Sequence, residues 1–210
     1  GVSITGALSR QWATLRHLRR YGNTFRFLLT YLLYTDAVTT MSLFVTIYAR
    51  SRNVSMEEIV LIFLLSQITA APGTLFMGRL ADRIGAKPTI AILIGLWLVL
   101  LGYGIFAHTF TDFLIIGLMA GVGVGALTTV SRAMMTMVSP PAHQAEFFGF
   151  FAVAGRASAV LGPPLFGAIS SLTGDARYAL PALMALLVAA LFLLRGVEVK
   201  RLHRRVPSAR

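Results

Sequence analysis

Residues 59–107 have the sequence IVLIFLLSQITAAPGTLFMGRLADRIGAKPTIAILIGLWLVLLGYGIFA, in which two long apolar runs flank a short charged segment. A helix needs roughly 20 predominantly apolar residues to cross a bilayer core of about 30 Å. Each of the two runs reaches that length. The stretch therefore predicts two membrane-spanning helices, at 59–78 and 89–107, joined by a charged turn outside the hydrocarbon.

The same pattern continues on both sides of this stretch. Four further spanning helices are expected at 25–48, 112–136, 147–170 and 178–195. The composition agrees, since only 13% of the residues are charged and 56% are hydrophobic, whereas soluble domains average about 25% charged residues. The sequence predicts an all-α integral membrane protein with six transmembrane helices. Its expected parts are a basic segment at 1–24, the bundle at 25–195 and a basic tail at 196–210.

The net charge of +11 is distributed unevenly along the chain. With these six spans, fifteen of the 19 Lys and Arg residues fall on the side that holds both termini. Multi-pass membrane proteins keep such an excess of basic residues on the cytoplasmic side. We therefore expect both termini on the cytoplasmic side of a bacterial inner membrane. Membrane lipids, rather than nucleic acid, are the expected partners of the positive charge.

Signatures of enzymes and of bound cofactors are missing from the sequence. It has no zinc-protease, nucleophile-elbow or phosphate-loop motif. It also has no cysteine, and its four histidines stand at breaks or termini without the spacing of metal ligands. We expect neither an enzyme nor a metal or cofactor site.

Charged residues within the predicted spans are the strongest candidates for function, because they are costly in lipid. Asp36 and Arg156 lie about 16 and 14 Å from the cytoplasmic face at about 1.5 Å per helical residue. Their helices run in the same direction, so the two side chains can meet. One hypothesis is an ion pair near the substrate path, with Asp36 taking up a proton when the pair opens. The alternative is a permanent pair that only fixes helix packing.

Several uncharged polar residues of the spans are further candidates for a substrate cavity. They are Gln67, Tyr34 and Thr128, although a helical Thr often bonds only its own backbone. In the fourth span, Gly117, Gly121 and Gly125 recur every four residues. Small residues at that spacing let two membrane helices approach closely.

The charged segment GRLADRIGAKP resembles the signature Gly-x-x-x-Asp-Arg-x-Gly-x-Lys of major facilitator superfamily transporters. The matching residues are Gly78, Asp82, Arg83, Gly85 and Lys87, and Ala86 stands where a second basic residue is usual. The resemblance implies a conformational latch, in which Asp82 lies near the start of the following helix. There it interacts with that helix's positive end and with Arg83 or Arg132. For Arg132, simple membrane anchoring and a clamp on Asp82 or Glu146 are both open.

Two further stretches are similar to one family within that superfamily. YLLYTDAVTTM (31–41) and SRAMMTMVSPPAHQAEFFGFFAVAGRASAVLGPPLFG (131–167) resemble the C-terminal half of UMF1/Atg22-like proteins. The resemblance implies helices 7 to 12 of a secondary transporter of small metabolites such as amino acids, working by alternating access. Protons are one candidate for the coupling ion, which the sequence does not specify. Its partner would be an N-terminal six-helix half or a second copy. The spans would bend at Pro72-Gly73 and at Gly162-Pro163-Pro164.

Two alternative functions stay open at this point. Gly162-Pro163 resembles the Gly-Pro signature of proton-coupled drug exporters, which would make this chain part of a multidrug antiporter. The other alternative is a membrane scaffold without transport activity, for which the basic termini and anionic lipid would be the main feature. A buried titratable pair on cavity-facing helices favours transport, since a scaffold held by a lipid-binding tail would need neither.

Overall fold

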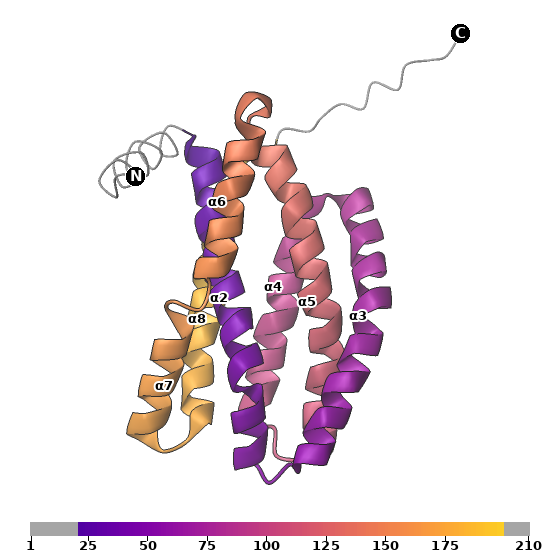
Figure 1. The fold of residues 1–210 in the computed structure, drawn as a ribbon, viewed down its shortest axis with the longest axis vertical. Coiled ribbons are helices and arrows are strands. Elements are labelled where there is room, and N and C mark those ends of the chain that lie inside the picture. Colours follow the sequence, from indigo (N-terminus) through magenta and orange to yellow (C-terminus); the bar gives the residue numbers. More distant parts are fainter. Residues whose placement is uncertain (1–20, 200–210) are drawn as a thin grey trace, which may run out of the picture.

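The computed structural model describes residues 21–199, and every regular element in that range is helical. In chain order these are α2 (Gly22–Ser51), α3 (Met56–Ile84), α4 (Ala86–Ile105), α5 (Phe110–Val138), the 3₁₀ turn η1 (Pro141–His143), α6 (Gln144–Ala157), α7 (Gly162–Thr173), the 3₁₀ turn η2 (Ala176–Ala179) and α8 (Leu180–Arg195). They form six spans long and apolar enough to cross a membrane (Figure 1). The predicted all-α fold with six spans is confirmed. The predicted basic segments lie mostly outside the described residues.

Two spans begin at capping boxes that their local sequence dictates. At the start of α3, the Glu58 N–H donates to Ser55 Oγ, and the Ser55 N–H donates to the Glu58 carboxylate, at 3.2 and 2.8 Å. Thr109 and Asp112 form the same reciprocal pair at the start of α5. These bonds satisfy amides that the first helical turn leaves without a partner. They fix the point at which each helix begins.

The charged segment between α3 and α4 is almost entirely helical. The helix α3 continues through Gly78 and Asp82 to Ile84, and α4 begins at Ala86. Only Gly85 separates them, with a φ of +100° that a residue with a Cβ rarely adopts. The prediction of a turn that starts at Gly78 is therefore wrong. Charged side chains do not interrupt helical hydrogen bonds, so one glycine is enough to end α3.

The helix α3 packs chiefly against α5, along the glycines of α5. A Cβ added to Gly121 would lie 2.2 Å from the Ser66 carbonyl oxygen and 2.6 Å from Thr69 Oγ1. Thr69 Oγ1 also donates a hydrogen bond of 2.8 Å to the Leu118 carbonyl across this contact. Gly117 and Gly125 meet α3 in the same way. The close helix approach expected from the spacing of these glycines is confirmed.

The core of the bundle lies between α2, α4, α5 and α8. Large side chains that are fully buried there include Phe27, Tyr34, Tyr48, Ile90, Leu93 and Met134. The Tyr48 hydroxyl donates to the Gly104 carbonyl at 2.5 Å, which joins α2 to α4. In contrast, Gly73 is the one residue of α3 that the rest of the bundle buries. The helix α3 is therefore held from one side, and most of its apolar surface is uncovered.

The two ends of the bundle are each joined by polar contacts. At the end where α2 begins and α8 stops, Asn23 and Glu198 exchange side-chain to backbone hydrogen bonds of 2.6 and 2.7 Å. Thr24 Oγ1 donates to the Val138 carbonyl at 2.6 Å, which brings the end of α5 to the same place. We call this the basic end, because Lys87 and Arg195 also lie there. Arg52 and Asp175 meet at the opposite end.

The fifth span is broken in its middle into α6 and α7. The break covers residues 158–161, and the Gly162-Pro163-Pro164 sequence forms the first turn of α7. The prediction that the helix bends at Gly162-Pro163-Pro164 is therefore displaced by about one turn. Proline fits the first helical turn, where its missing N–H removes no helical bond, so the interruption precedes the prolines.

Candidate functional site

An acidic side chain of α2 closes the break in the fifth span. Asp36 lies near the middle of α2 and is only 1% exposed. Its Oδ1 accepts the N–H groups of Ala159 and Leu161, the second at 3.3 Å, and its Oδ2 accepts the Gly162 N–H at 2.6 Å. All three amides belong to the break or to the first residue of α7. A carboxylate is thus seated at the start of a helix, midway along a spanning segment.

This seat for Asp36 follows from the local backbone. The first amides of a helix have no helical acceptor and carry partial positive charge, so they favour an anion. Hydrogen bonds to an ionised acceptor are about twice as strong as neutral ones. Within the break Ala159 has a φ of +88°, which costs a non-glycine residue about 1–3 kcal/mol. Such a conformation persists only where the surrounding structure stabilises it, and here the hydrogen bond from the Ala159 N–H to Asp36 does so.

Arg156 does not form the predicted ion pair with Asp36. Among residues 21–199, no carboxylate lies within ion-pair distance of the Arg156 guanidinium, and this side chain is exposed in the last turn of α6. The predicted depths along the two helices do not specify the direction in which each side chain points. The amides of the break occupy both oxygens of Asp36 instead. The partner of Asp36 is therefore backbone rather than arginine.

The uncharged candidates occupy two different environments. Tyr34 is fully buried, and its hydroxyl lies 2.6 Å from Ser131 Oγ, so it links α2 to α5. Gln67 and Thr128 are exposed on α3 and α5, and Thr128 Oγ1 donates to the Val124 carbonyl one turn earlier. Tyr34 is therefore part of the buried core, as Asp36 is, whereas Gln67 and Thr128 lie on the surface of the described bundle.

The residues of the predicted latch do not contact one another as expected. Asp82 is exposed in the last turn of α3 rather than at the start of α4, and in the part of the chain described here it forms no ion pair with Arg83 or Arg132. Glu146 lies 3.7 Å from His143 Nδ1, within its own helical turn, and not beside Arg132. Because α3 stays helical to Ile84, Asp82 and Arg83 are successive residues of one helix, and such residues do not face each other.

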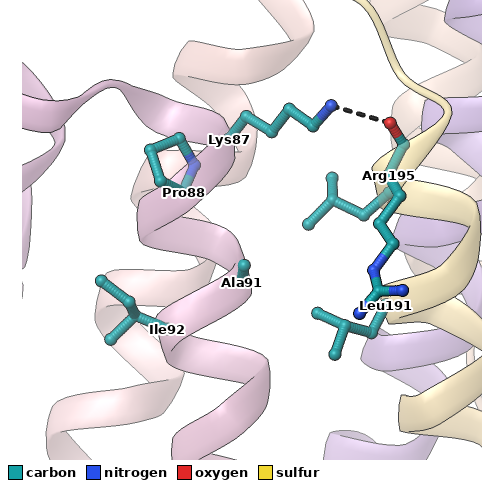
Figure 2. A pocket seen from close by; sticks show the side chains of 7 residues that line it. Lys87, Pro88, Ala91, Ile92, Leu191 and Arg195 are labelled. Carbon is teal, nitrogen blue, oxygen red and sulfur yellow. Dashed lines mark hydrogen bonds between the residues drawn. The ribbon is translucent and has the colours of Figure 1, made fainter.

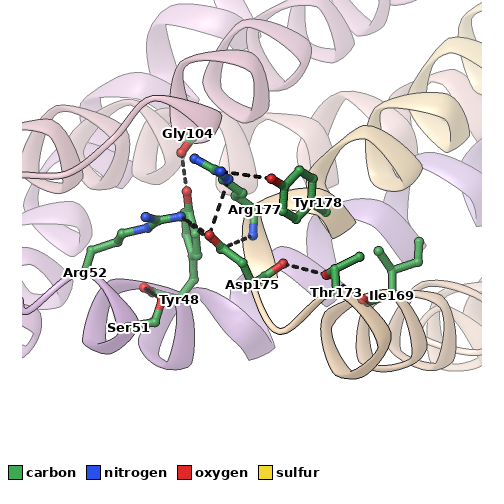
Figure 3. A network of polar contacts seen from close by, with 9 residues as sticks. All are labelled: Tyr48, Ser51, Arg52, Gly104, Ile169, Thr173, Asp175, Arg177 and Tyr178. Carbon is green, nitrogen blue, oxygen red and sulfur yellow. Dashed lines mark hydrogen bonds and ion pairs between the residues drawn. The ribbon is translucent and has the colours of Figure 1, made fainter.

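A polar cluster at the opposite end escaped the sequence analysis (Figure 3). Arg52 Nη2 donates to both carboxylate oxygens of Asp175, at 2.9 and 3.0 Å, and the Arg177 N–H donates to the same carboxylate at 3.0 Å. The Arg52 guanidinium lies over the Tyr48 ring. These contacts join the ends of α2 and α4 to the α7–η2 connection. The available signal was one acidic residue, Asp175, in the loop that precedes Arg177 on a side with few basic residues.

The Asp175 carboxyl is expected to stabilise the protein in a pH-dependent way. Partial burial raises its pKa, but the Arg177 amide and the Arg52 and Arg177 guanidinium groups outweigh this and hold the pKa below its usual value. The stabilisation is therefore full above the unfolded pKa of about 4 and is lost as the pH falls through the lowered folded value. Asp175→Asn should lower the melting temperature by a few degrees at pH 7, about the effect of 1 kcal/mol.

Thermal unfolding of the purified protein between pH 7 and pH 3 checks this prediction. The difference between Asp175→Asn and the parent should shrink as the pH falls. Glu57→Gln, which changes an exposed carboxylate at the same end, is the matched control and should have little effect. A difference that stays constant with pH would mean that Asp175 acts through its shape and not its charge.

Comparison with known proteins places this architecture in a family. The family model described as "Vacuole effluxer Atg22 like" matches residues 2–206, almost the whole chain. The chain belongs to the Atg22-like family. A similar protein is the "Uncharacterized MFS-type transporter YxiO" of Bacillus subtilis, 28% identical over 92% of this chain and 45% of that protein. "Autophagy-related protein 22" of Kluyveromyces lactis is 26% identical over 90% of this chain and 41% of its own length.

These findings confirm the family resemblance seen in the sequence. Family membership and six apolar helices make this Atg22-like chain an integral, multi-pass membrane protein. The relatives are named as a transporter and as effluxer-like proteins, in agreement with the expectation that the chain is not an enzyme. The chain spans less than half the length of the relatives it matches.

Proposed function

We propose that this chain is part of a secondary active transporter that moves small metabolites, such as amino acids, by alternating access. The observation that carries the proposal is the broken fifth span, with Asp36 seated at its break. Secondary transporters build substrate and ion sites near the membrane midplane from discontinuous helices. Ionisable groups within spans are costly and mark substrate or proton pathways. A scaffold without transport activity would need neither feature.

Asp36 is suited to couple proton uptake to a change in the broken span. As a carboxylate it accepts three N–H bonds from the break. A proton would remove the negative charge that strengthens all three bonds, and on Oδ1, which already accepts two amides, it would also take the place of one of them. Protonation would therefore loosen the start of α7 and allow the break to change its shape. In this proposal Asp36 carries the proton, and Arg156 is a substrate candidate separate from it.

A second six-helix unit is the proposed partner of this bundle. Gln67, Thr128, Arg132 and Arg156 are exposed on α3, α5 and α6. Polar and charged side chains are costly against lipid, so such residues usually face protein or a water-filled cavity. The partial coverage of the relatives supports a missing half, and a second copy is the other arrangement. The substrate path would then lie between the two units.

The proposed orientation follows from charge. The basic end carries Lys87 and Arg195, and the basic segments of the sequence lead into it and out of it. We propose that this end lies on the cytoplasmic side of a bacterial inner membrane, because an excess of basic residues favours that side. In a closed state the cytoplasmic latch of Asp82, Arg83 and Arg132 would then find its contacts on the second unit.

Uptake by the whole protein reconstituted into liposomes tests the proposed function. With an imposed proton gradient and radiolabelled amino acids supplied one at a time, we expect accumulation above protein-free liposomes and its loss on addition of a protonophore. Accumulation that persists with the protonophore would contradict proton coupling but not the transport of amino acids. Correctly inserted protein that carries no amino acid would contradict the amino-acid assignment, and transport of cationic dyes instead would favour the drug-exporter alternative.

A further inference from the structure

A groove runs between α4 and α8 at the basic end of the bundle (Figure 2). Its volume is about 490 Å³, within the range of roughly 300–1,000 Å³ that small-molecule sites occupy. The side chains of Ala91, Ile92, Leu191 and Leu194 form its apolar part, and Lys87 and Arg195 stand at its end. No acidic residue lines it. The groove is therefore lined by apolar side chains and by two cations.

Lys87 bridges the two helices that border the groove. Its Nζ donates to the Arg195 carbonyl at 2.9 Å and to the Val197 carbonyl at 2.7 Å, and so reaches from the first turn of α4 to the end of α8. These carbonyls have no helical donor and carry partial negative charge. A lysine ammonium has three N–H donors. Two are used in this bridge, and one is left for a further acceptor.

Arg195 supplies a positive charge that no carboxylate of residues 21–199 neutralises. Figure 2 shows its side chain running back along α8 toward Leu191, away from the hydrogen bond between Lys87 and the Arg195 carbonyl. Its guanidinium lies 5.3 Å from the centre of the exposed Phe192 ring. Within the described range, 21–199, no carboxylate comes within ion-pair distance of it. The groove thus presents a cation, flanked by apolar surface, that lacks an anionic partner.

We propose that this groove binds an anionic phospholipid of the bilayer. The phosphate would lie at Arg195 and the free donor of Lys87, and an acyl chain would lie along Ala91, Ile92 and Leu191. Basic pockets between spanning helices bind anionic headgroups in this manner. The first turn of α4 and the last turn of α8 place the two cations where a span meets the headgroup region, with the apolar part of the groove directed toward the hydrocarbon.

The chemistry of the lining favours an anionic lipid over other occupants. A zwitterionic lipid would present an ammonium group as well as a phosphate, and no lining acid is available to pair with it. A peptide segment would bring backbone polar groups to apolar walls that cannot satisfy them. In the sequence, Arg195 is followed by four more basic residues, Lys200, Arg201, Arg204 and Arg205.

The test measures which lipid stays with the whole protein. The unmodified protein is reconstituted into nanodiscs of equal parts phosphatidylglycerol and phosphatidylcholine, then extracted, and the retained lipids are counted by native mass spectrometry. We expect phosphatidylglycerol to be enriched. A photoreactive phosphatidylglycerol should crosslink to peptides of α4 and α8. Equal retention of the two lipids, or crosslinks distributed evenly over all spans, would overturn the proposal without any substitution.

Two matched pairs of variants locate the site. Arg195→Gln should lower phosphatidylglycerol enrichment about fivefold, the effect expected for one cation at an anionic surface, whereas Arg50→Gln at the opposite end should not. Ile92→Trp fills the groove and should reduce crosslinking at α4 and α8. Val99→Trp, two turns further along the exposed face of α4, should not. If Arg195→Gln retains as much phosphatidylglycerol as Arg50→Gln, or Ile92→Trp crosslinks as strongly as Val99→Trp, the lipid is held by diffuse charge and the groove is not its site.

Discussion

Asp36→Ala is expected to lower the free energy of unfolding by about 3 kcal/mol, because one buried and two part-buried N–H groups lose their acceptor, and a buried donor left without a partner costs about 1–3 kcal/mol. The same change removes the anion from the start of α7, so that Ala159 keeps its positive φ without the bonds that hold it. Unfolding by SDS in mixed micelles, followed by circular dichroism, measures this loss.

Two further variants separate the role of charge from that of shape at this position. Asp36→Asn keeps one acceptor oxygen but turns an NH₂ group toward an amide donor, so we expect a smaller loss of stability with a large loss of proton-driven flux. Ser42→Ala is the control on the same helix, since Ser42 bonds only the Val38 carbonyl of α2. Equal stability of Asp36→Ala and Ser42→Ala would contradict a structural role for the carboxylate. Near-normal proton-driven flux in inserted Asp36→Asn would remove Asp36 from the coupling mechanism.

Gly121→Ala is expected to have an effect of similar size through packing alone. Its Cβ would lie 2.2 Å from the Ser66 carbonyl oxygen, which is backbone and cannot rotate away. Overpacking of a well-filled core costs about 1–3 kcal/mol, and a collision with backbone of a neighbouring helix belongs at the upper end of that range. Because α3 is attached mainly through α5, its separation should appear as increased proteolysis within α3.

Gly95→Ala is the matched control for this prediction. Gly95 lies within α4, and nothing approaches the position of its added Cβ within 4 Å. Alanine is favoured over glycine in a helix by up to about 1 kcal/mol, so this variant should be neutral or slightly stabilised. If Gly95→Ala and Gly121→Ala change the stability in the same direction, the α3–α5 contact does not depend on the absence of a side chain at Gly121.

The sequence predicted the spans well, because apolar length is a direct consequence of the thickness of a bilayer. It also predicted the close approach of α3 and α5 from the spacing of three glycines. It failed at Gly78–Ile84, where clustered charge suggested a turn although the residues are compatible with a helix. The real turn depended on the conformation of one residue, Gly85, which composition does not reveal.

At the site, Asp36 was identified from its cost in lipid, but its partner was not. The predicted partner is a charged side chain, whereas the groups that bind Asp36 are amides freed by a helix break. Backbone groups carry no sequence signal of their own. The prolines after Gly162 marked the break only indirectly. The Arg52–Asp175 cluster was missed for a related reason, since two residues 123 positions apart meet only once the bundle has formed.

The one-residue link at Gly85 has a mechanical consequence for the basic end. Without a loop to absorb displacement, a tilt of α3 must be transmitted to the first turn of α4. Lys87 lies in that turn and holds the end of α8 through two carbonyls. The least buried helix is therefore connected to the last helix through three consecutive residues, so a push applied to α3 by a neighbouring bundle would open or narrow the groove between α4 and α8.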